Sequence, residues 1–120
     1  MLWIRLGSFF MFLGVLLGAF GAHALKGTLS EEGKVLWHTA VLYHVVHGLG
    51  LLAVGWLATL KPQEPLLSKA GWAFAVGIVL FSGSLYLLSL TGMKKLGMLT
   101  PFGGLAFLAG WVFLALAAKP

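Results

Sequence analysis

The chain has 120 residues, of which 60% are hydrophobic and only 9% are charged, and its mean hydropathy is +1.00. These values lie outside the usual range of soluble domains and predict an integral membrane protein. The net charge of +5 comes from lysines at the ends of apolar segments, which favours contact with lipid headgroups over nucleic acid, and the absence of cysteine excludes disulfides and thiolate metal sites.

Four apolar stretches are long enough to cross a bilayer, which needs roughly 20 residues per helix. They cover residues 3–25, 35–60, 70–90 and 99–118. The short connections between them carry all three acidic residues. Because short connections make consecutive helices antiparallel neighbours, the sequence predicts an all-α membrane protein, an up-down bundle of four transmembrane helices formed by residues 1–120 as a single domain.

The first stretch carries glycines at helical spacing. Gly7, Gly14, Gly18 and Gly21 fall on one stripe and include a GxxxG pair, which predicts the close approach of a second helix. An alternative is a secretory signal peptide, because Arg5, the apolar run and the letters "AHA" imitate one. A removed leader has no need of a packing stripe, so the glycines favour a helix of the bundle.

The four crossings define two membrane faces, side A and side B. Side A holds the N-terminus, the second connection and the C-terminus, and side B holds the first and third connections. The basic residues divide four to four between them (Arg5, Lys61, Lys69 and Lys119 against Lys26, Lys34, Lys94 and Lys95), so the positive-inside rule gives no orientation.

The second stretch contains "VLYHVVHGLGLL", with His44 and His47 three residues apart in an apolar run. Most of the other polar residues within the spans lie in the same half of the membrane, toward side B: His23, His38, Tyr43, Ser82, Ser84, Tyr86, Ser89 and Thr100. The half toward side A is almost wholly apolar. This distribution predicts a polar cavity that opens toward side B, reaches His47 and is closed toward side A by packed Leu, Phe and Trp.

Helical phase predicts a specific hydrogen bond. Ser82, Tyr86 and Ser89 follow i, i+4, i+7 spacing and therefore share a face, at depths matching the two histidines. An unpaired imidazole N–H in hydrocarbon would cost several kcal/mol. We therefore expect His47 or His44 to bond to Ser82 or Tyr86.

Three interpretations of the histidines follow. Polar side chains commonly hold membrane helices together, which is a structural role. Intramembrane ionisable groups also mark proton, small-ligand or lipid sites, which would lie in a pocket around His47. Metal or haem binding is the third, although His23 and His38 lie at the membrane face, and His38 is roughly 13 Å of helix rise from His47. The spans contain no acidic residue to complete a di-iron site or a catalytic triad, so no cofactor and no catalytic residue is assigned.

The segments "LGAFGAHAL", "VLFSGSLYLL" and "TPFGGLAFLAGW", with Tyr43 and His47 between them, resemble the YgdD-like family of small membrane proteins, also called domain of unknown function 423 or UPF0382. The resemblance covers nearly the whole chain. It implies a four-helix protein of bacterial inner membranes with no established activity. The family pattern includes positions matching His23, Tyr43, His47, Ser82, Gly83, Ser84, Tyr86, Thr100, Pro101, Gly103, Gly104, Gly110 and Trp111, but not His44.

We therefore expect a multi-pass protein of the cell (inner) membrane that acts as a structural or interaction component in contact with the lipid bilayer. Its protein partners would be a second copy of the chain or another membrane protein. The candidate ligand-binding residues are His47, Tyr43, His44, Ser82, Ser84, Tyr86, His23 and Thr100.

Overall fold

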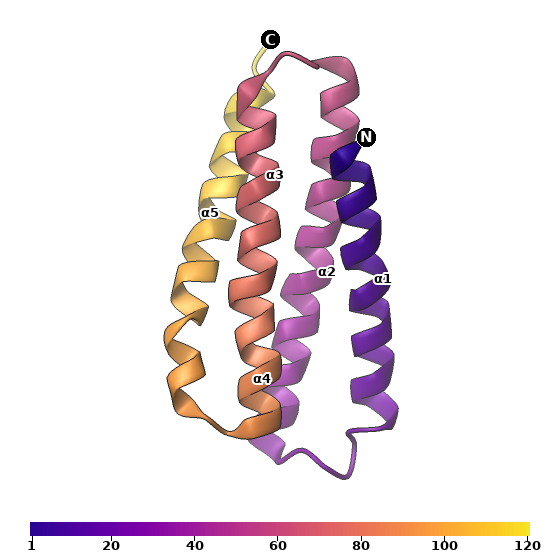
Figure 1. Ribbon diagram of the computed structural model, residues 1–120, viewed down its shortest axis with the longest axis vertical. Helices are drawn as coiled ribbons and strands as arrows, with labels where there is room; N and C mark the ends of the chain where they lie inside the picture. Colours follow the sequence, from indigo (N-terminus) through magenta and orange to yellow (C-terminus); the bar gives the residue numbers. More distant parts are fainter.

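Four long helices run up and down in the computed structural model, which describes residues 1–120 (Figure 1). The first two are α1 (Leu2–His23) and α2 (Glu31–Leu60). The third crossing is continuous through α3 (Pro65–Gly77), a π-helical turn η1 (Ile78–Ser82) and α4 (Gly83–Thr91). A 3₁₀ turn η2 (Lys94–Met98) leads into α5 (Thr100–Ala117). All four crossings are long and apolar enough to span a membrane, so the predicted all-α fold is confirmed.

Local sequence signals set the helix ends. The Ser30 hydroxyl accepts a hydrogen bond of 3.0 Å from the backbone N–H of Gly33 and so caps α2. The Glu64 carboxylate accepts one of 3.0 Å from Leu66 at the start of α3. At the other end of this crossing Gly92 adopts φ +70°, a left-handed conformation that stops α4 and that a residue with a side chain rarely adopts.

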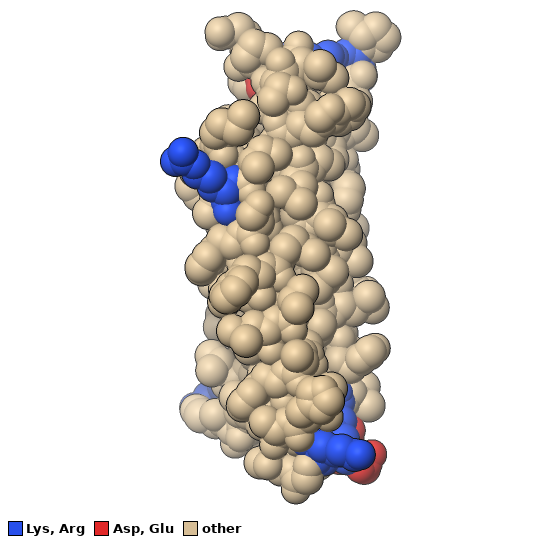
Figure 2. Space-filling view, turned by 90° about the vertical axis from the view of Figure 1, so that its right-hand side faces the viewer, with Lys and Arg blue, Asp and Glu red and all other residues tan.

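The helices lie in the order α5, α3, α2, α1 across the view of Figure 1. The outer helix α1 packs mainly on α2, and α5 packs mainly on α3 and η1, while α2 contacts α3, η1 and α4. The molecule is 50 Å long, which exceeds the roughly 40–45 Å of a bilayer with its headgroups. Figure 2 shows charged side chains at the two ends, a basic side chain that lies further in from the upper end, and an uncharged band between it and the lower end.

The glycine stripe of α1 forms its contact with α2, as the sequence predicts. A Cβ on Gly7 would lie 2.8 Å from the Leu52 side chain, and one on Gly14 would lie 3.0 Å from Val45. A Cβ on Gly21 would overlap the Trp37 indole. Because a side chain at these positions would crowd or overlap its neighbour on α2, the glycines let the two backbones approach closely enough to gain packing energy without a hydrophobic driving force.

The half of the bundle toward side A is a packed apolar core, which confirms the prediction that this half is closed. Phe74, Leu51 and Val54 are fully buried there. The core cluster consists of Trp3, Leu51, Val54, Leu67, Ala70, Phe74, Ile78, Phe107 and Ala117. Most of the other large apolar side chains are exposed on the outside of the bundle, as expected where the surrounding medium is lipid.

The π-helical turn in the third crossing was not predicted. Here the N–H of Gly83 bonds to the carbonyl of Ile78, an i to i+5 step, and one extra residue enters the helix. Helix α5 approaches the third crossing closely at this level, since a Cβ on Gly103 would overlap the backbone of Phe81. The turn therefore lies at a close contact between two helices.

Candidate functional site

His47 has a partner on each ring nitrogen. Its Nδ1 lies 2.7 Å from the carbonyl oxygen of Tyr43, one turn earlier in α2, and its Nε2 lies 3.0 Å from the indole Nε1 of Trp111 in α5. The carbonyl can only accept and the indole can only donate, so the imidazole carries its proton on Nδ1 and accepts at Nε2. This pairing suits a neutral ring and leaves neither nitrogen open.

Aromatic side chains enclose the same imidazole. The His47 ring is stacked on Phe107 with centroids 3.5 Å apart and an interplanar angle of 8°. Phe74 and Trp111 lie at centroid distances of 5.5 and 5.6 Å, and His47 is 4% exposed. The polar ring is therefore part of an apolar, closely packed contact between α2, α3 and α5.

His44 bonds to α4, which confirms the predicted hydrogen bond between a histidine and Tyr86. Its Nδ1 lies 2.8 Å from the Tyr86 hydroxyl, and the residue is 2% exposed. Its Nε2 is buried without a hydrogen-bond partner and faces α1, where a Cβ on Gly14 would lie 3.7 Å away.

The hydroxyl groups of the third crossing also bond between helices. The Ser82 hydroxyl donates to the carbonyl of Ala40 over 2.8 Å, and Ser89 donates to the carbonyl of Gly33 over 2.6 Å. Together with Tyr86, both face α2, as their spacing predicts. Ser84 points instead toward α5, where its hydroxyl lies 2.6 Å from that of Thr100.

The cavity predicted around His47 is absent, so that prediction is wrong. None of the four hollows in the structure is lined by any of the candidate ligand-binding residues. Phe107 and Trp111 fill the space beside His47, because Gly103 lets α5 approach the third crossing. The largest hollow does lie near side B, but between α1 and α2.

Two candidate residues are not joined to the polar contacts through their side chains. His23 is exposed at the end of α1. Tyr43 is 41% exposed and gives its backbone carbonyl to His47, while its ring packs on Phe81 with centroids 4.6 Å apart. No three side chains among His, Asp and Glu are close enough together to hold a metal ion.

Sequence reasoning missed the aromatic partners. Trp111 and Phe107 are four residues apart on α5 and both contact His47, a spacing that marks one helical face. Trp37 in α2 makes a further bond between helices that the sequence does not predict. Its indole N–H donates to the carbonyl of Leu17 over 3.0 Å and links α1 to α2.

Comparison with known proteins places the chain among membrane proteins of unknown function. The family described as "Protein of unknown function (DUF423)" matches residues 17–104. The "UPF0382 membrane protein YwdK" of Bacillus subtilis is 47% identical over 115 residues, which cover 96% of this chain and 94% of the relative. The "UPF0382 membrane protein SH2409" of Staphylococcus haemolyticus is 44% identical over 116 residues, covering 97% and 93%. No solved structure matches the chain. With this extent of similarity, and with four membrane-spanning helices, the chain belongs to the DUF423 family of membrane proteins.

Proposed function

We propose that this protein is a structural or interaction component of the cell (inner) membrane, in which the intramembrane polar residues hold the helices in one arrangement. The observation that carries the proposal is the use of these groups. His47, His44, Ser82, Ser84 and Thr100 each have a hydrogen-bond partner on a neighbouring helix, and His47 and Ser84 have a second one on their own. None of them lines a hollow.

The physical chemistry of the bilayer supports this role. A polar group left unpaired in hydrocarbon costs several kcal/mol, and an interhelical bond in a membrane contributes about 0.6 kcal/mol on average. Each bond therefore adds little stability, but moving a helix so that a polar group loses its partner costs more than the bond itself contributes. The bonds to α2 and α5 select one rotation of the third crossing among those that apolar packing alone would allow.

The alternative functions lack an observation in their favour. A proton or small-ligand pathway around His47 would need an opening beside the ring, and Phe107 is stacked on it at 3.5 Å. Metal binding would need several ligands around a free ring nitrogen. Both nitrogens of His47 have partners within the protein, and the unpaired Nε2 of His44 belongs to no group of three His, Asp or Glu side chains that could hold a metal ion.

Thermal unfolding in detergent tests the structural role. Wild type, His47→Ala and the control His23→Ala would be compared, each alone and with zinc, copper, haem or a lipid extract. We expect His47→Ala to unfold at a lower temperature and His23→Ala to match wild type, because His23 is exposed. We expect no additive to protect wild type through His47. An additive that raises the wild-type melting temperature but has no effect on His47→Ala would contradict the proposal and name the ligand class.

A further inference from the structure

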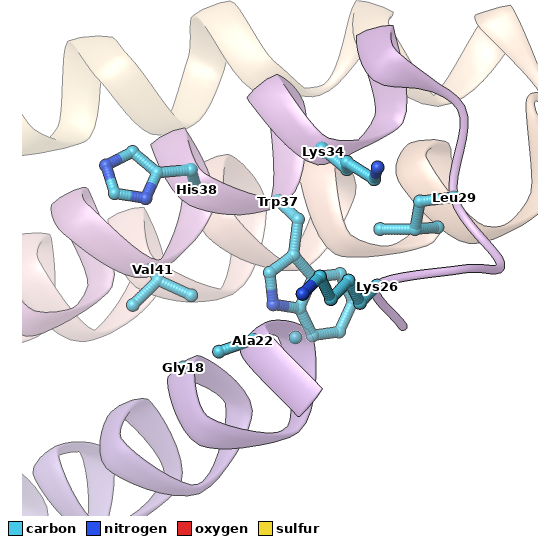
Figure 3. Close-up of a pocket in the computed structure, with 9 residues that line it drawn as sticks. Gly18, Ala22, Lys26, Leu29, Lys34, Trp37, His38 and Val41 are labelled. Atoms are coloured by element: carbon cyan, nitrogen blue, oxygen red, sulfur yellow. The ribbon is translucent and has the colours of Figure 1, made fainter. Parts of the chain in front are cut away.

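A hollow of about 590 Å³ opens between α1 and α2 close to side B (Figure 3). It is the largest of the four hollows, and its volume lies within the roughly 300–1,000 Å³ typical of ligand sites. His44, His47 and the residues that hydrogen-bond to them do not line it. What binds there is therefore a separate question from the structural role of the histidines.

The inner wall of the hollow is apolar and rigid. Its largest component is the Trp37 indole, which is 6% exposed and is held by its bond to the Leu17 carbonyl. The ring also packs on Tyr86 with centroids 4.7 Å apart, and Gly21 leaves no space for it to move toward α1. Val41 extends the wall toward the membrane interior. The wall exists without a ligand, so little ordering would be needed on binding.

The rim of the hollow is basic. Lys26, Lys34 and His38 line it, and no acidic side chain does. Lys34 forms an ion pair with Glu31 at 3.0 Å, whereas Lys26 forms none. Figure 3 shows the three basic side chains spread around the hollow, Lys26 from the α1–α2 connection and the other two from α2.

The hollow extends below headgroup level, so its ligand should have a charged end and an apolar end. Gly18 lines the inner end and lies five residues before the last residue of α1, about 7.5 Å along the helix. A bound molecule therefore meets positive charge at headgroup level and apolar surface below it. A free anion would use only the rim, and a neutral hydrocarbon would use only the wall.

We infer that this hollow binds an anionic phospholipid, with its phosphate near Lys26 and Lys34 and the upper part of one acyl chain against Trp37 and Val41. The basic rim matches the charged headgroup, and the apolar wall below it matches the acyl chain. Juxtamembrane lysines attract anionic lipid in general, so the specific content of the inference is that these two lysines do so through a built hollow.

Native mass spectrometry of the protein in detergent tests the site. The probes are phosphatidylglycerol, phosphatidylcholine with the same acyl chains, and inorganic phosphate. We expect wild type to retain phosphatidylglycerol preferentially and phosphate to compete poorly. Lys26→Gln should weaken phosphatidylglycerol binding about fivefold, and Lys26→Gln with Lys34→Gln about tenfold, because the ion pair with Glu31 already offsets part of the Lys34 charge. The matched control, Lys94→Gln with Lys95→Gln, removes two charges from side B outside this hollow and should change binding less than twofold.

A second pair of variants tests the hollow rather than its charge. Ala22→Phe places a ring in the hollow, and the control Ala19→Phe adds the same ring on an exposed position of α1 that does not line it. We expect only Ala22→Phe to abolish the preference for phosphatidylglycerol. Equal weakening by the two lysine pairs, or binding unaffected by Ala22→Phe, would overturn the inference, as would equal retention of both lipids by wild type. The readout is lipid retention, so it is independent of the melting temperatures that test the role of His47.

Discussion

His47 and Trp111 are separated by 64 residues in the sequence and are joined by a hydrogen bond of 3.0 Å between their ring nitrogens. This bond links α2 to α5, two helices that otherwise meet mainly through the third crossing. The donor is an indole N–H, which cannot accept, so the bond depends on an unprotonated Nε2.

Trp111→Phe should therefore destabilise the protein by about 1 kcal/mol, because it keeps an aromatic ring but leaves Nε2 of His47 buried and unpaired. The measurement is unfolding in detergent by a denaturing surfactant. The control is Trp56→Phe, since Trp56 is 61% exposed and its indole makes no hydrogen bond. In a double-mutant cycle with His47→Phe the two effects should be less than additive, and strict additivity would show that the bond contributes nothing.

The pair formed by His44 and Tyr86 allows a test of partner removal. Tyr86→Phe leaves both nitrogens of His44 buried without a partner, because Nε2 already has none. We expect a loss of about 1–2 kcal/mol for this variant. Replacing both residues by Phe should cost less than Tyr86→Phe alone, since no buried polar group is then unpaired. If the double variant is less stable than Tyr86→Phe, the lost hydrogen bond does not account for the destabilisation.

The contact between α1 and α2 should be sensitive to a single methyl group at Gly21. Gly21→Ala would place a Cβ inside the Trp37 indole, whose position is set by the Leu17 carbonyl and by Tyr86. Overpacking of this kind costs about 1–3 kcal/mol. Gly27→Ala is the control, because nothing lies within 4 Å of its Cβ position. Thermal unfolding of the two variants should differ clearly, and similar melting temperatures would contradict the close packing.

Gly103 and Gly104 provide adjacent positions with opposite expectations. A Cβ on Gly103 would overlap the backbone of Phe81, which cannot rotate aside, whereas a Cβ on Gly104 would be 3.9 Å from the Phe81 ring. Gly103→Ala should therefore destabilise the protein by about 1–3 kcal/mol and Gly104→Ala by little. The reverse order of stability in detergent would mean that α5 is rotated from its position here.

The up-down topology can be tested by labelling, because the chain has no cysteine of its own. Thr28→Cys and Met93→Cys lie at side B, and Gln63→Cys lies at side A. A membrane-impermeant maleimide applied to intact cells or spheroplasts should label either both side B cysteines and not the side A cysteine, or the side A cysteine alone. The same result would establish which side faces outward, which the even division of lysines does not predict. Labelling of all three from one side would contradict the topology.

The helices and their facing surfaces could be predicted because they depend on periodicity. The α1 stripe and the shared face of Ser82, Tyr86 and Ser89 repeat at helical spacing, and each meets α2 as expected. The apolar half toward side A follows from composition alone.

The surroundings of His47 could not be predicted in the same way. They depend on the rotation of α5 about its axis and on its distance from the third crossing. Both are set by the contact of Gly103 with the backbone of Phe81. Hydropathy does not report such contacts. The polar residues toward side B therefore predict a cavity, whereas in the structure aromatic rings fill the space beside His47.

The π-helical turn Ile78–Ser82 gives the third crossing a length that matters as much as its composition. Each residue added to or removed from a helix rotates everything beyond it by about 100°. If the same residues ran as a regular α-helix without this turn, Ser84 would be carried away from α5 and Tyr86 away from His44 in a single step. A chain of the same length that keeps all the polar residues but lacks the π-helical turn would thus have these hydrogen-bonding groups directed at lipid.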